Sequence, residues 1–368
     1  MRIAFYAPLK PPDHPVASGD RRVAQLFLAA LRLAGHEPVL ASRFRSYEGE
    51  GDSLRQARLA AFGRRLADHF LQHCRDVPQN APELWFTYHL YHKAPDWLGP
   101  MIADALDIPY VVAEASDAPK QASGPWRIGH RAVADAIRRA DAVIGLNPAD
   151  RCCVLPLMRD PRRWFAIKPF LDAAPYKRAS RAEPGPLRLI AIAMMRHGDK
   201  LASYRMLGDA LSQLLDLSWV LEVVGGGPAR REVGDALAPV ADRVVWAGVL
   251  GPTEIAERMA SSDLYVWPAI NEAYGMAVLE AQAAGLPVVA GAGAGVGEIV
   301  ASESTGLLVP PGDAIAFATA VRGLIIDRDR RAAFAEAAQR KVQTEHDLWS
   351  AARRLGAAIE MLGRARAA

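Results

Sequence analysis

The stretch from residue 263 to residue 297 limits what this chain can fold into more than any other part of the sequence. The apolar run 264–268 predicts a buried parallel strand, 276–284 predicts a helix that ends at Gly285, and 286–290 predicts a second buried strand. A loop rich in glycine, 291–297, comes next. The order describes one βαβ unit. Open α/β sheets bind ligands at the carboxyl ends of such strands, so we expect a binding site here.

Two glutamates occupy this unit. Glu272 lies in the turn before the predicted helix, and Glu280 lies eight residues further on. Eight residues correspond to about 800° of helical rotation, which brings both carboxylates to the same side. Pro268, Gly275 and the run 285–289 give these acids the setting of a ligand site.

The segment Glu272-Ala-Tyr-Gly-Met-Ala-Val-Leu-Glu280 resembles the E-x7-E signature of the retaining family 4 glycosyltransferases, which have the GT-B fold. The resemblance spans nearly the whole chain; it is strong over 187–313 and generic before 167. It implies an α/β protein of two doubly wound, Rossmann-like domains that face a central cleft. The expected domains are 1–166 with the final helix, 347–368, crossing back to it, a linker at 167–186, and 187–346.

Length and composition agree with a chain of two domains. A chain of 368 residues exceeds what one core usually serves, and a net charge of +3 is too small to predict a nucleic-acid partner. Cys74, Cys152 and Cys153 have no metal-binding spacing, which suits a reducing cytoplasm. No apolar run reaches the roughly 18 residues of a membrane span, and the first residues predict a strand and not a signal peptide. We therefore expect a cytoplasmic protein.

The predicted helix 53–74 raises the question of a membrane surface. Arginines 55, 58, 64 and 65 lie off its apolar stripe, and such a basic face can rest on anionic lipid. The alternative is an ordinary surface helix, and the acids at 52, 68 and 76 favour it. Peripheral contact with the inner face of the cytoplasmic membrane is thus a second expectation about location.

Candidate acceptor residues lie at predicted strand ends in the first half. His89 and His92 follow the strand 84–88 and could serve as general bases, although loop histidines often bond only to backbone. Gly19 lies before a predicted helix, where the resembled family has two glycines near the donor phosphates and the acceptor. The family also has a histidine after the strand 110–113. Glu114 and Asp117 stand there instead, so an acid takes that role, another donor is recognised, or the leaving phosphate acts as the base; a structural role for both acids is the alternative.

Candidate donor residues lie in the second half. Arg196 and Lys200 follow the strand 187–193, and together they can neutralise a departing diphosphate without a metal ion. By resemblance Glu280 holds the ribose hydroxyls, Glu272 and the amides of Ala273, Tyr274, Gly275 and Met276 meet sugar and phosphate, and Val249 flanks the base. Gly225 and Gly227 would let a ligand approach the backbone. Asp327-Arg-Asp329 matches a metal-binding DxD only formally, because it lies in a charged run between helices, so no metal or other cofactor is expected.

The resemblance implies an enzyme that moves a hexose-type sugar from a nucleotide-diphosphate sugar, with UDP favoured, to an acceptor hydroxyl with retention of configuration. Glycan, glycolipid or cell-surface polysaccharide synthesis is the expected setting, and the acceptor, lipid-linked or saccharide, stays open. A sugar-nucleotide epimerase and a non-catalytic nucleotide-sugar-binding protein are the alternatives. A protein that only contacts a lipid surface is a third.

Overall fold

The computed structural model describes residues 1–16, 18–177, 185–272 and 274–367. For residues 294 and 364–367 it describes the backbone alone. The chain divides into two compact units, each of which has its own sheet. Unit 1 contains Met1–Lys168 and the C-terminal Leu348–Ala368, and unit 2 contains Pro169–Asp347. Each unit is described here by itself.

Unit 1 is built on a parallel sheet of six strands in the order β2-β1-β3-β4-β5-β6. Its strands are β1 (Arg2–Tyr6), β2 (Glu37–Ser42), β3 (Leu84–Leu90), β4 (Tyr110–Ala115), β5 (Ala142–Gly145) and β6 (Trp164–Ala166). Its α-helices are α1 (Gly19–Leu33), α2 (Ser53–Asp76), α3 (Gly99–Ala105), α4 (Arg127–Arg139), α5 (Arg151–Val154) and α13 (Leu348–Ala367). The central strands are buried on both sides, as parallel sheets require.

Unit 2 repeats this plan with the strand order β12-β11-β10-β7-β8-β9. Its strands are β7 (Leu187–Ile192), β8 (Trp219–Val224), β9 (Val244–Gly248), β10 (Leu264–Trp267), β11 (Val288–Gly291) and β12 (Gly306–Val309). Its α-helices are α6 (Asp199–Leu211), α7 (Arg230–Ala236), α8 (Pro252–Ala260), α9 (Met276–Ala283), α10 (Ala294–Ile299), α11 (Ala314–Ile326) and α12 (Arg328–Lys341). The predicted fold class of two doubly wound parallel sheets is confirmed.

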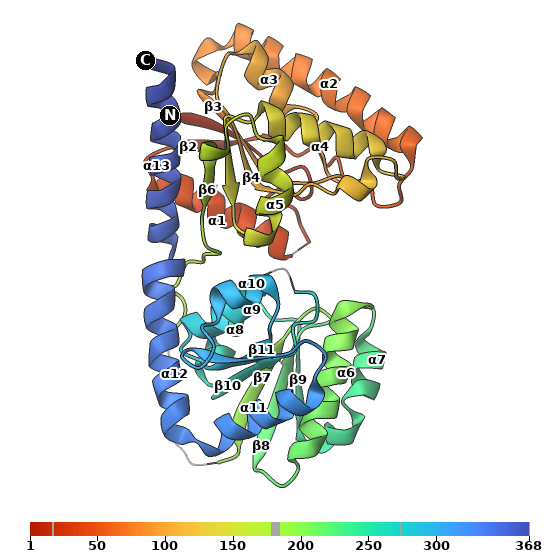
Figure 1. Cartoon of the computed structure of the whole chain (residues 1–368), viewed down its shortest axis with the longest axis vertical. Helices are drawn as coiled ribbons and strands as arrows, with labels where there is room; N and C mark the ends of the chain where they lie inside the picture. Colours follow the sequence, from red (N-terminus) through yellow and green to blue (C-terminus); the bar gives the residue numbers. More distant parts are fainter. Residues whose placement is uncertain (17, 178–184, 273, 368) are drawn as a thin grey trace. The chain divides into compact units, whose positions relative to one another are not determined.

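The last helix, α13, belongs to unit 1 although the chain reaches it from unit 2. It packs against α1 and buries Leu355, Ile359 and Leu362 (Figure 1). The expectation that the final helix returns to the first sheet agrees with this packing. The two ends of the described chain therefore lie in the same unit.

One local prediction was wrong, because residues 294–299 form α10 and not a glycine loop. Three other features position the loops of the two sheets. The Ser18 hydroxyl caps α1 by accepting from the Arg21 amide. Helix α6 begins at Asp199, directly after Gly198 at φ +79°. The strand β6 extends the first sheet beyond β5.

A buried carboxylate holds the start of α3 against the first sheet. Asp96 is 3% exposed, and its Oδ1 accepts from the amides of Leu98 and Gly99 at 2.9 and 2.8 Å. Its Oδ2 accepts from the Thr87 and Tyr110 hydroxyls. Burial raises the pKa of this carboxyl, and the hydrogen bonds oppose that effect. Four hydrogen-bond donors, two backbone amides and two hydroxyls, therefore use the Asp96 carboxylate as an acceptor.

We expect Asp96→Ala to lower the free energy of unfolding of unit 1 by about 3 kcal/mol, because it leaves several buried donors without an acceptor. Asp96→Asn keeps an oxygen for the two amides and should lose roughly half as much. Urea unfolding followed by tryptophan fluorescence measures both. Asp135→Ala removes an acid that is 60% exposed and should change stability by less than about 0.5 kcal/mol. Equal losses for Asp96→Ala and Asp135→Ala would contradict the role of Asp96.

Candidate functional site

The strand order places a switch point in each sheet. In unit 2 the order reverses between β7 and β10, and in unit 1 it reverses between β1 and β3. The loops that follow the two strands of a switch point diverge and leave room for a ligand. The candidate residues Lys200 and Glu272 follow β7 and β10, and His89 is the last residue but one of β3.

In unit 2 the two loops meet through an ion pair. Lys200 lies in the first turn of α6, and its ammonium contacts the Glu272 carboxylate. Both side chains are only partly exposed, at 26% and 18%. The ammonium also lies 5.5 Å from the centre of the Trp267 ring, whose Nε1 donates to Glu272 at 3.4 Å. Two of the predicted catalytic residues are thus in direct contact, and Trp267 fixes both.

Two hydrogen bonds hold the Glu272 turn against α6, and the sequence singled out none of the four residues that make them as site residues. The side-chain amide of Asn271 donates to the Asp199 carboxylate at 3.0 Å, and the backbone amide of Ile270 donates to the Ser203 hydroxyl at 3.1 Å. Asn271 has a positive φ of +49°. Such conformations cost on the order of 1–3 kcal/mol for residues other than glycine, and they gather at functional sites. No sequence pattern links residues 199 and 271, so only the fold reveals the contact.

Glu272 and Glu280 are not two turns of one helix. Helix α9 begins at Met276, after Gly275 at φ +69°, so Glu272 lies outside it and the rotation argument was wrong. The two acids nevertheless share a neighbour. The pKa of the buried Tyr265 hydroxyl is raised first by burial and further by the Glu272 and Glu280 carboxylates. Both acids therefore lie close to the end of β10.

The remaining donor candidates come from three loops of unit 2. Tyr274, Gly275 and Met276 lead into α9, and Ala273 falls outside the described residues. Arg196 is exposed between β7 and α6, and Val249 is 81% exposed after β9.

Packing by itself requires the two glycines after β8, and their role in ligand binding stays a prediction. A Cβ at Gly225 would lie 2.0 Å from the carbonyl oxygen of Ala193, and one at Gly227 would lie 2.3 Å from that of Met195. Both also have positive φ, +139° and +149°. Close packing of the β8 loop against the β7 loop therefore already requires glycine, whatever ligand approaches.

In unit 1 the corresponding pair is a histidine and an acid. The His89 imidazole, at the end of β3, lies 3.2 Å from the carboxylate of Asp20, in the first turn of α1. Glu114, at the equivalent place on β4, faces the same imidazole. His89 and Glu114 both have positive φ, +63° and +57°, and the pairing of β3 with β4 omits this rung. Strained residues gather at functional sites, so this edge is a candidate site.

The charges around His89 shift its titration. Burial alone lowers the pKa of His89, but the Glu114 and Asp20 carboxylates and, more weakly, Asp150 outweigh it, so the pKa is raised. The pKa of Glu114 is raised, first by burial. The pKa of Asp20 is lowered, because His89 outweighs the effect of burial.

A second pair of the same kind lies after β4. Asp117, which is 6% exposed, has its Oδ1 3.1 Å from Nε2 of His130 on α4. His92 lies beside them, half-buried, with its ring 5.7 Å from that of Trp126, and burial and Lys93 lower its pKa. The two pairs, together with Glu114 and Asp150, make up six side chains that we call the acid–histidine cluster. Its members are Asp20, His89, Glu114, Asp117, His130 and Asp150. The sequence did not predict Asp20, His130 or Asp150 as site residues. Of these, only Asp20 had a signal in the sequence, because it directly follows Gly19.

Gly19 does not join either pair. It is the first residue of α1, and a Cβ there would meet nothing within 4 Å. Packing therefore gives no reason for glycine at this position, and its role in donor binding stays a prediction.

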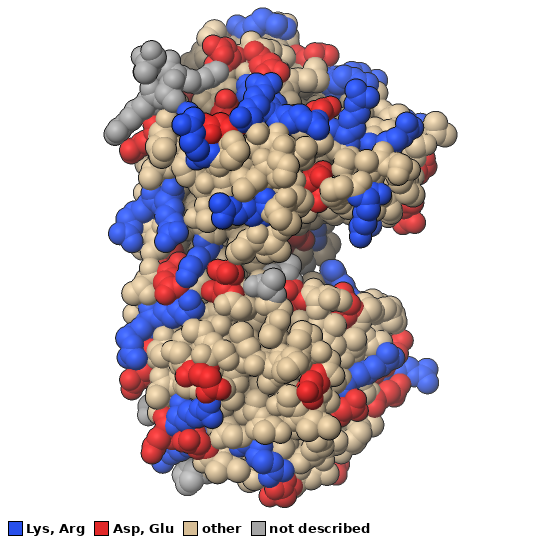
Figure 2. Space-filling view, in the orientation of Figure 1, with Lys and Arg blue, Asp and Glu red and all other residues tan. Residues whose placement is uncertain are grey.

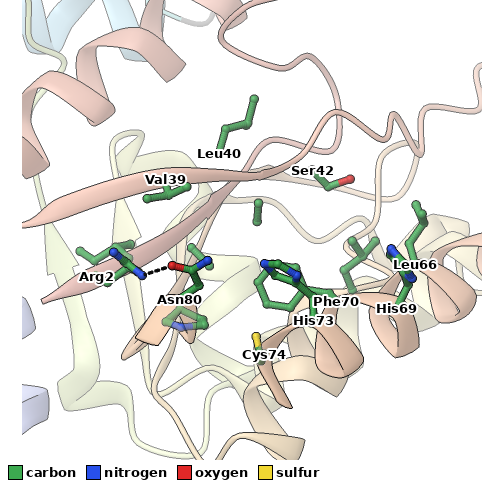
Figure 3. A pocket seen from close by; sticks show the side chains of 15 residues that line it. Arg2, Val39, Leu40, Ser42, Leu66, His69, Phe70, His73, Cys74 and Asn80 are labelled. Carbon is green, nitrogen blue, oxygen red and sulfur yellow. Dashed lines mark hydrogen bonds between the residues drawn. The ribbon is translucent and has the colours of Figure 1, made fainter. Parts of the chain in front are cut away.

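An apolar cavity of about 480 Å³ lies elsewhere in unit 1, between β2 and α2. Figure 3 shows Leu66, Phe70 and Cys74 from α2 and Val39 from β2 around it. None of the predicted catalytic or donor-binding residues lines it. It is distinct from both switch points.

Helix α2 also carries the arginines of the predicted basic face. Basic and acidic side chains alternate over this part of unit 1 in Figure 2. Leu54 and Phe62 are exposed on α2, at 70% and 44%. Contact of α2 with a membrane surface stays a prediction. None of the described helices is both long and apolar enough to span a bilayer.

The formal DxD has a structural explanation. Asp327 caps α12, because its carboxylate accepts from the Arg330 amide at 2.9 Å. In the described part of the chain, no three His, Cys, Asp or Glu side chains come together as metal ligands.

Two six-stranded parallel sheets, each wound by helices, define a glycosyltransferase-type GT-B architecture. Sucrose-phosphate synthase from Thermosynechococcus elongatus has the same fold, with a TM-score of 0.74, 20% identity and 99% of both chains covered. The Anabaena protein HepE in complex with UDP matches with a TM-score of 0.72 and 17% identity, over 98% of this chain and all of its own.

Sequence comparison leads from this class to a family. The D-inositol 3-phosphate glycosyltransferase of Kineococcus radiotolerans is 30% identical over 301 residues, which are 69% of this chain and 67% of that enzyme. The family model described as glycosyl transferases group 1 matches residues 187–327. This chain therefore belongs to the group 1 glycosyltransferases. Sulfoquinovosyl transferase SQD2 of Arabidopsis thaliana is 34% identical over 132 residues, only 25% of its length.

We expect the His89 pKa to fall in Asp20→Asn and in Glu114→Gln, because each change removes a carboxylate that stabilises the imidazolium. The stabilisation by this ion pair is fully present below the unfolded pKa of about 6.5 and is lost as pH rises through the higher folded pKa. An NMR titration of the His89 ring measures the shift. Asp13→Asn, which removes an acid paired with Arg43, is the matched control. An unchanged His89 titration in both test variants would contradict this reading.

Proposed function

We propose that this glycosyltransferase moves a hexose-type sugar from a nucleotide-diphosphate sugar to an acceptor hydroxyl, with retention of anomeric configuration. The observation that carries the proposal is the contact of Lys200 with Glu272 at the switch point of unit 2. This pair lies where open α/β sheets bind nucleotides, and it belongs to the segment that resembles the E-x7-E signature.

The leaving diphosphate gains negative charge as its bond to the sugar breaks. Lys200 supplies a fixed positive charge, and the first turn of α6 adds the positive end of a helix dipole. Arg196, exposed just before α6, can supply a planar fork for the phosphate oxygens. These groups would stabilise the leaving diphosphate without a metal ion. In other transferases a divalent cation does this.

Glu272 would change partners when the donor binds. In the structure its carboxylate neutralises Lys200. A bound diphosphate competes for that ammonium and leaves the carboxylate free to accept hydrogen bonds from sugar hydroxyls. Glu280 would accept from the two ribose hydroxyls. The acceptor proton would pass to the departing phosphate oxygen, so the reaction needs no separate protein base.

The proposal that UDP is the nucleotide of the donor rests on similar proteins. The solved structures of Anabaena HepE include complexes with UDP and with UDP-glucose. Other matches are described as GDP-mannose-dependent, so the base is open to direct test. The alternatives, an epimerase and a binding protein without turnover, predict the same nucleotide site. An epimerase would release an epimeric sugar, whereas a binding protein would form no product.

We expect one nucleoside diphosphate among UDP, GDP, ADP and dTDP to raise the melting temperature, because a ligand that binds only the folded state stabilises it. Lys200→Ala should abolish the shift, since it removes the cation that faces the phosphates. Differential scanning fluorimetry measures both.

Arg205→Ala removes an exposed cation from the same helix and serves as the control. It should keep the wild-type shift. A full shift in Lys200→Ala would sink the assignment of the phosphate site, and no shift with any nucleotide in the wild type would count against the whole proposal.

We further expect product formation to survive excess EDTA, and the new glycosidic bond to keep the configuration of the donor. Proton NMR of the product reports the configuration from the anomeric coupling. Transfer with inversion would overturn the retaining mechanism. Release of an epimeric sugar without any acceptor would support the epimerase instead.

A further inference from the structure

One rung of the first sheet explains the apolar cavity between β2 and α2. Strand pairing places four residues of neighbouring strands side by side: Val39, Ala4, Trp85 and Tyr110. Residues on one rung of a parallel sheet point to the same face. Trp85 and Tyr110 are fully buried in the core on this face, whereas Ala4 and Val39 are smaller and line the cavity. The cavity of about 480 Å³ therefore lies where small side chains follow large ones along the rung.

The walls of the cavity are mostly aliphatic, and part of this apolar surface is open to solvent. Val39 is 46% exposed, and Leu66 and Phe70 of α2 are half-buried although they pack against the core of unit 1. Contact of apolar surface with water is unfavourable, so an apolar molecule that displaces this water would bind. The volume lies within the range of about 300–1,000 Å³ that is usual for ligand pockets.

The cavity is elongated along α2. Its lining residues on this helix begin at Leu66 and end at Cys74, eight residues further on, which is about 12 Å of helix. Figure 3 shows Leu66 and His69 towards one end of the cavity, and Arg2 and Asn80 towards the other. An elongated space with aliphatic walls suits an alkyl chain, because the chain can bend to follow the walls.

The end of the cavity at Arg2 continues into a polar hollow. Arg2 lines both spaces, and the hollow is also lined by polar side chains, those of His36, Glu37, Gln79 and Glu83. The Arg2 guanidinium is held in place, because its Nη1 donates to Oδ1 of Asn80 at 3.1 Å and its Nη2 lies 3.5 Å from Oε1 of Glu37. An apolar space that ends at fixed polar groups matches an amphiphile, whose chain leaves water while its head stays hydrated.

We propose that the cavity between β2 and α2 binds a single alkyl chain of an amphiphile, with the polar head at the end formed by Arg2 and Asn80. This site is separate from glycosyl transfer, since none of the predicted catalytic or donor-binding residues lines it. The chain has two sources, a free single-chain amphiphile or a lipid that inserts one chain from a membrane. The experiments below test the shared chemistry first and then distinguish the sources.

The first experiment titrates the protein with n-octyl-, n-decyl- and n-dodecylphosphocholine below their critical micelle concentrations, followed by isothermal titration calorimetry. The Kd should fall roughly threefold or more for each added methylene until the cavity is full, because each methylene is removed from water. Phosphocholine without a chain should not bind measurably.

Two variants place the chain in the cavity. Ala41→Phe and Val39→Trp fill the space from β2 and should each raise the Kd for n-dodecylphosphocholine at least about tenfold. Ala332→Phe adds the same ring as Ala41→Phe at an exposed position of α12 and should keep the wild-type Kd. Melting temperatures report whether all three variants fold. Their response to nucleotides should equal that of the wild type, because the cavity is separate from the donor site.

Sedimentation with vesicles of dioleoylphosphatidylcholine distinguishes the two sources. Vesicle binding that is lost in Ala41→Phe and Val39→Trp would identify a chain inserted from a membrane. Tight binding of n-dodecylphosphocholine without vesicle binding would identify a free amphiphile.

The inference is overturned if n-dodecylphosphocholine does not bind, if the Kd does not depend on chain length, or if folded Ala41→Phe and Val39→Trp keep the wild-type Kd. Vesicle binding that both variants retain would place the contact on the outside of α2 and not in the cavity. A dimer in light scattering that Ala41→Phe converts to a monomer would show that a second copy of the chain occupies the cavity instead. Each of these results leaves the proposed glycosyl transfer untouched.

Discussion

Parallel strand pairing at the two switch points is the constraint on which the rest of this structure depends. Beside β7 and β10 in unit 2, and beside β1 and β3 in unit 1, neighbouring strands continue into loops that turn away from each other. Each switch point then brings together two side chains that are far apart in sequence. Lys200 meets Glu272, and Asp20 meets His89. Both contacts follow from strand order and not from any local pattern.

The two pairs have different surroundings. Lys200 and Glu272 lie beside Trp267, and hydrogen bonds to Ser203 and Asp199 hold the turn of Glu272 against α6. His89 lies among carboxyl groups that favour its charged form. In the proposed reaction, Lys200 is the group that meets the anionic donor.

The fold class could be predicted from the sequence because its signals are local. Buried β-branched runs and glycine stops mark strands and helices. The donor loop stays a prediction, which rests on the resemblance of the segment from Glu272 to Glu280. Helix α10 was missed because its glycines read as loop. The contacts of His130 with Asp117 and of Asn271 with Asp199 could not be predicted, since tertiary packing alone creates them. The glycines after β8 were noticed, but their cause lies in backbone carbonyls that no sequence shows.

Helix α13 has a consequence for the order in which the chain can fold during synthesis. Unit 2 is one uninterrupted segment, so it can complete its core as soon as it leaves the ribosome. Unit 1 emerges first but needs Leu355, Ile359 and Leu362, which are translated after unit 2, to cover α1. The earlier half of the protein must therefore wait, with an apolar helix surface uncovered, until α13 has been translated.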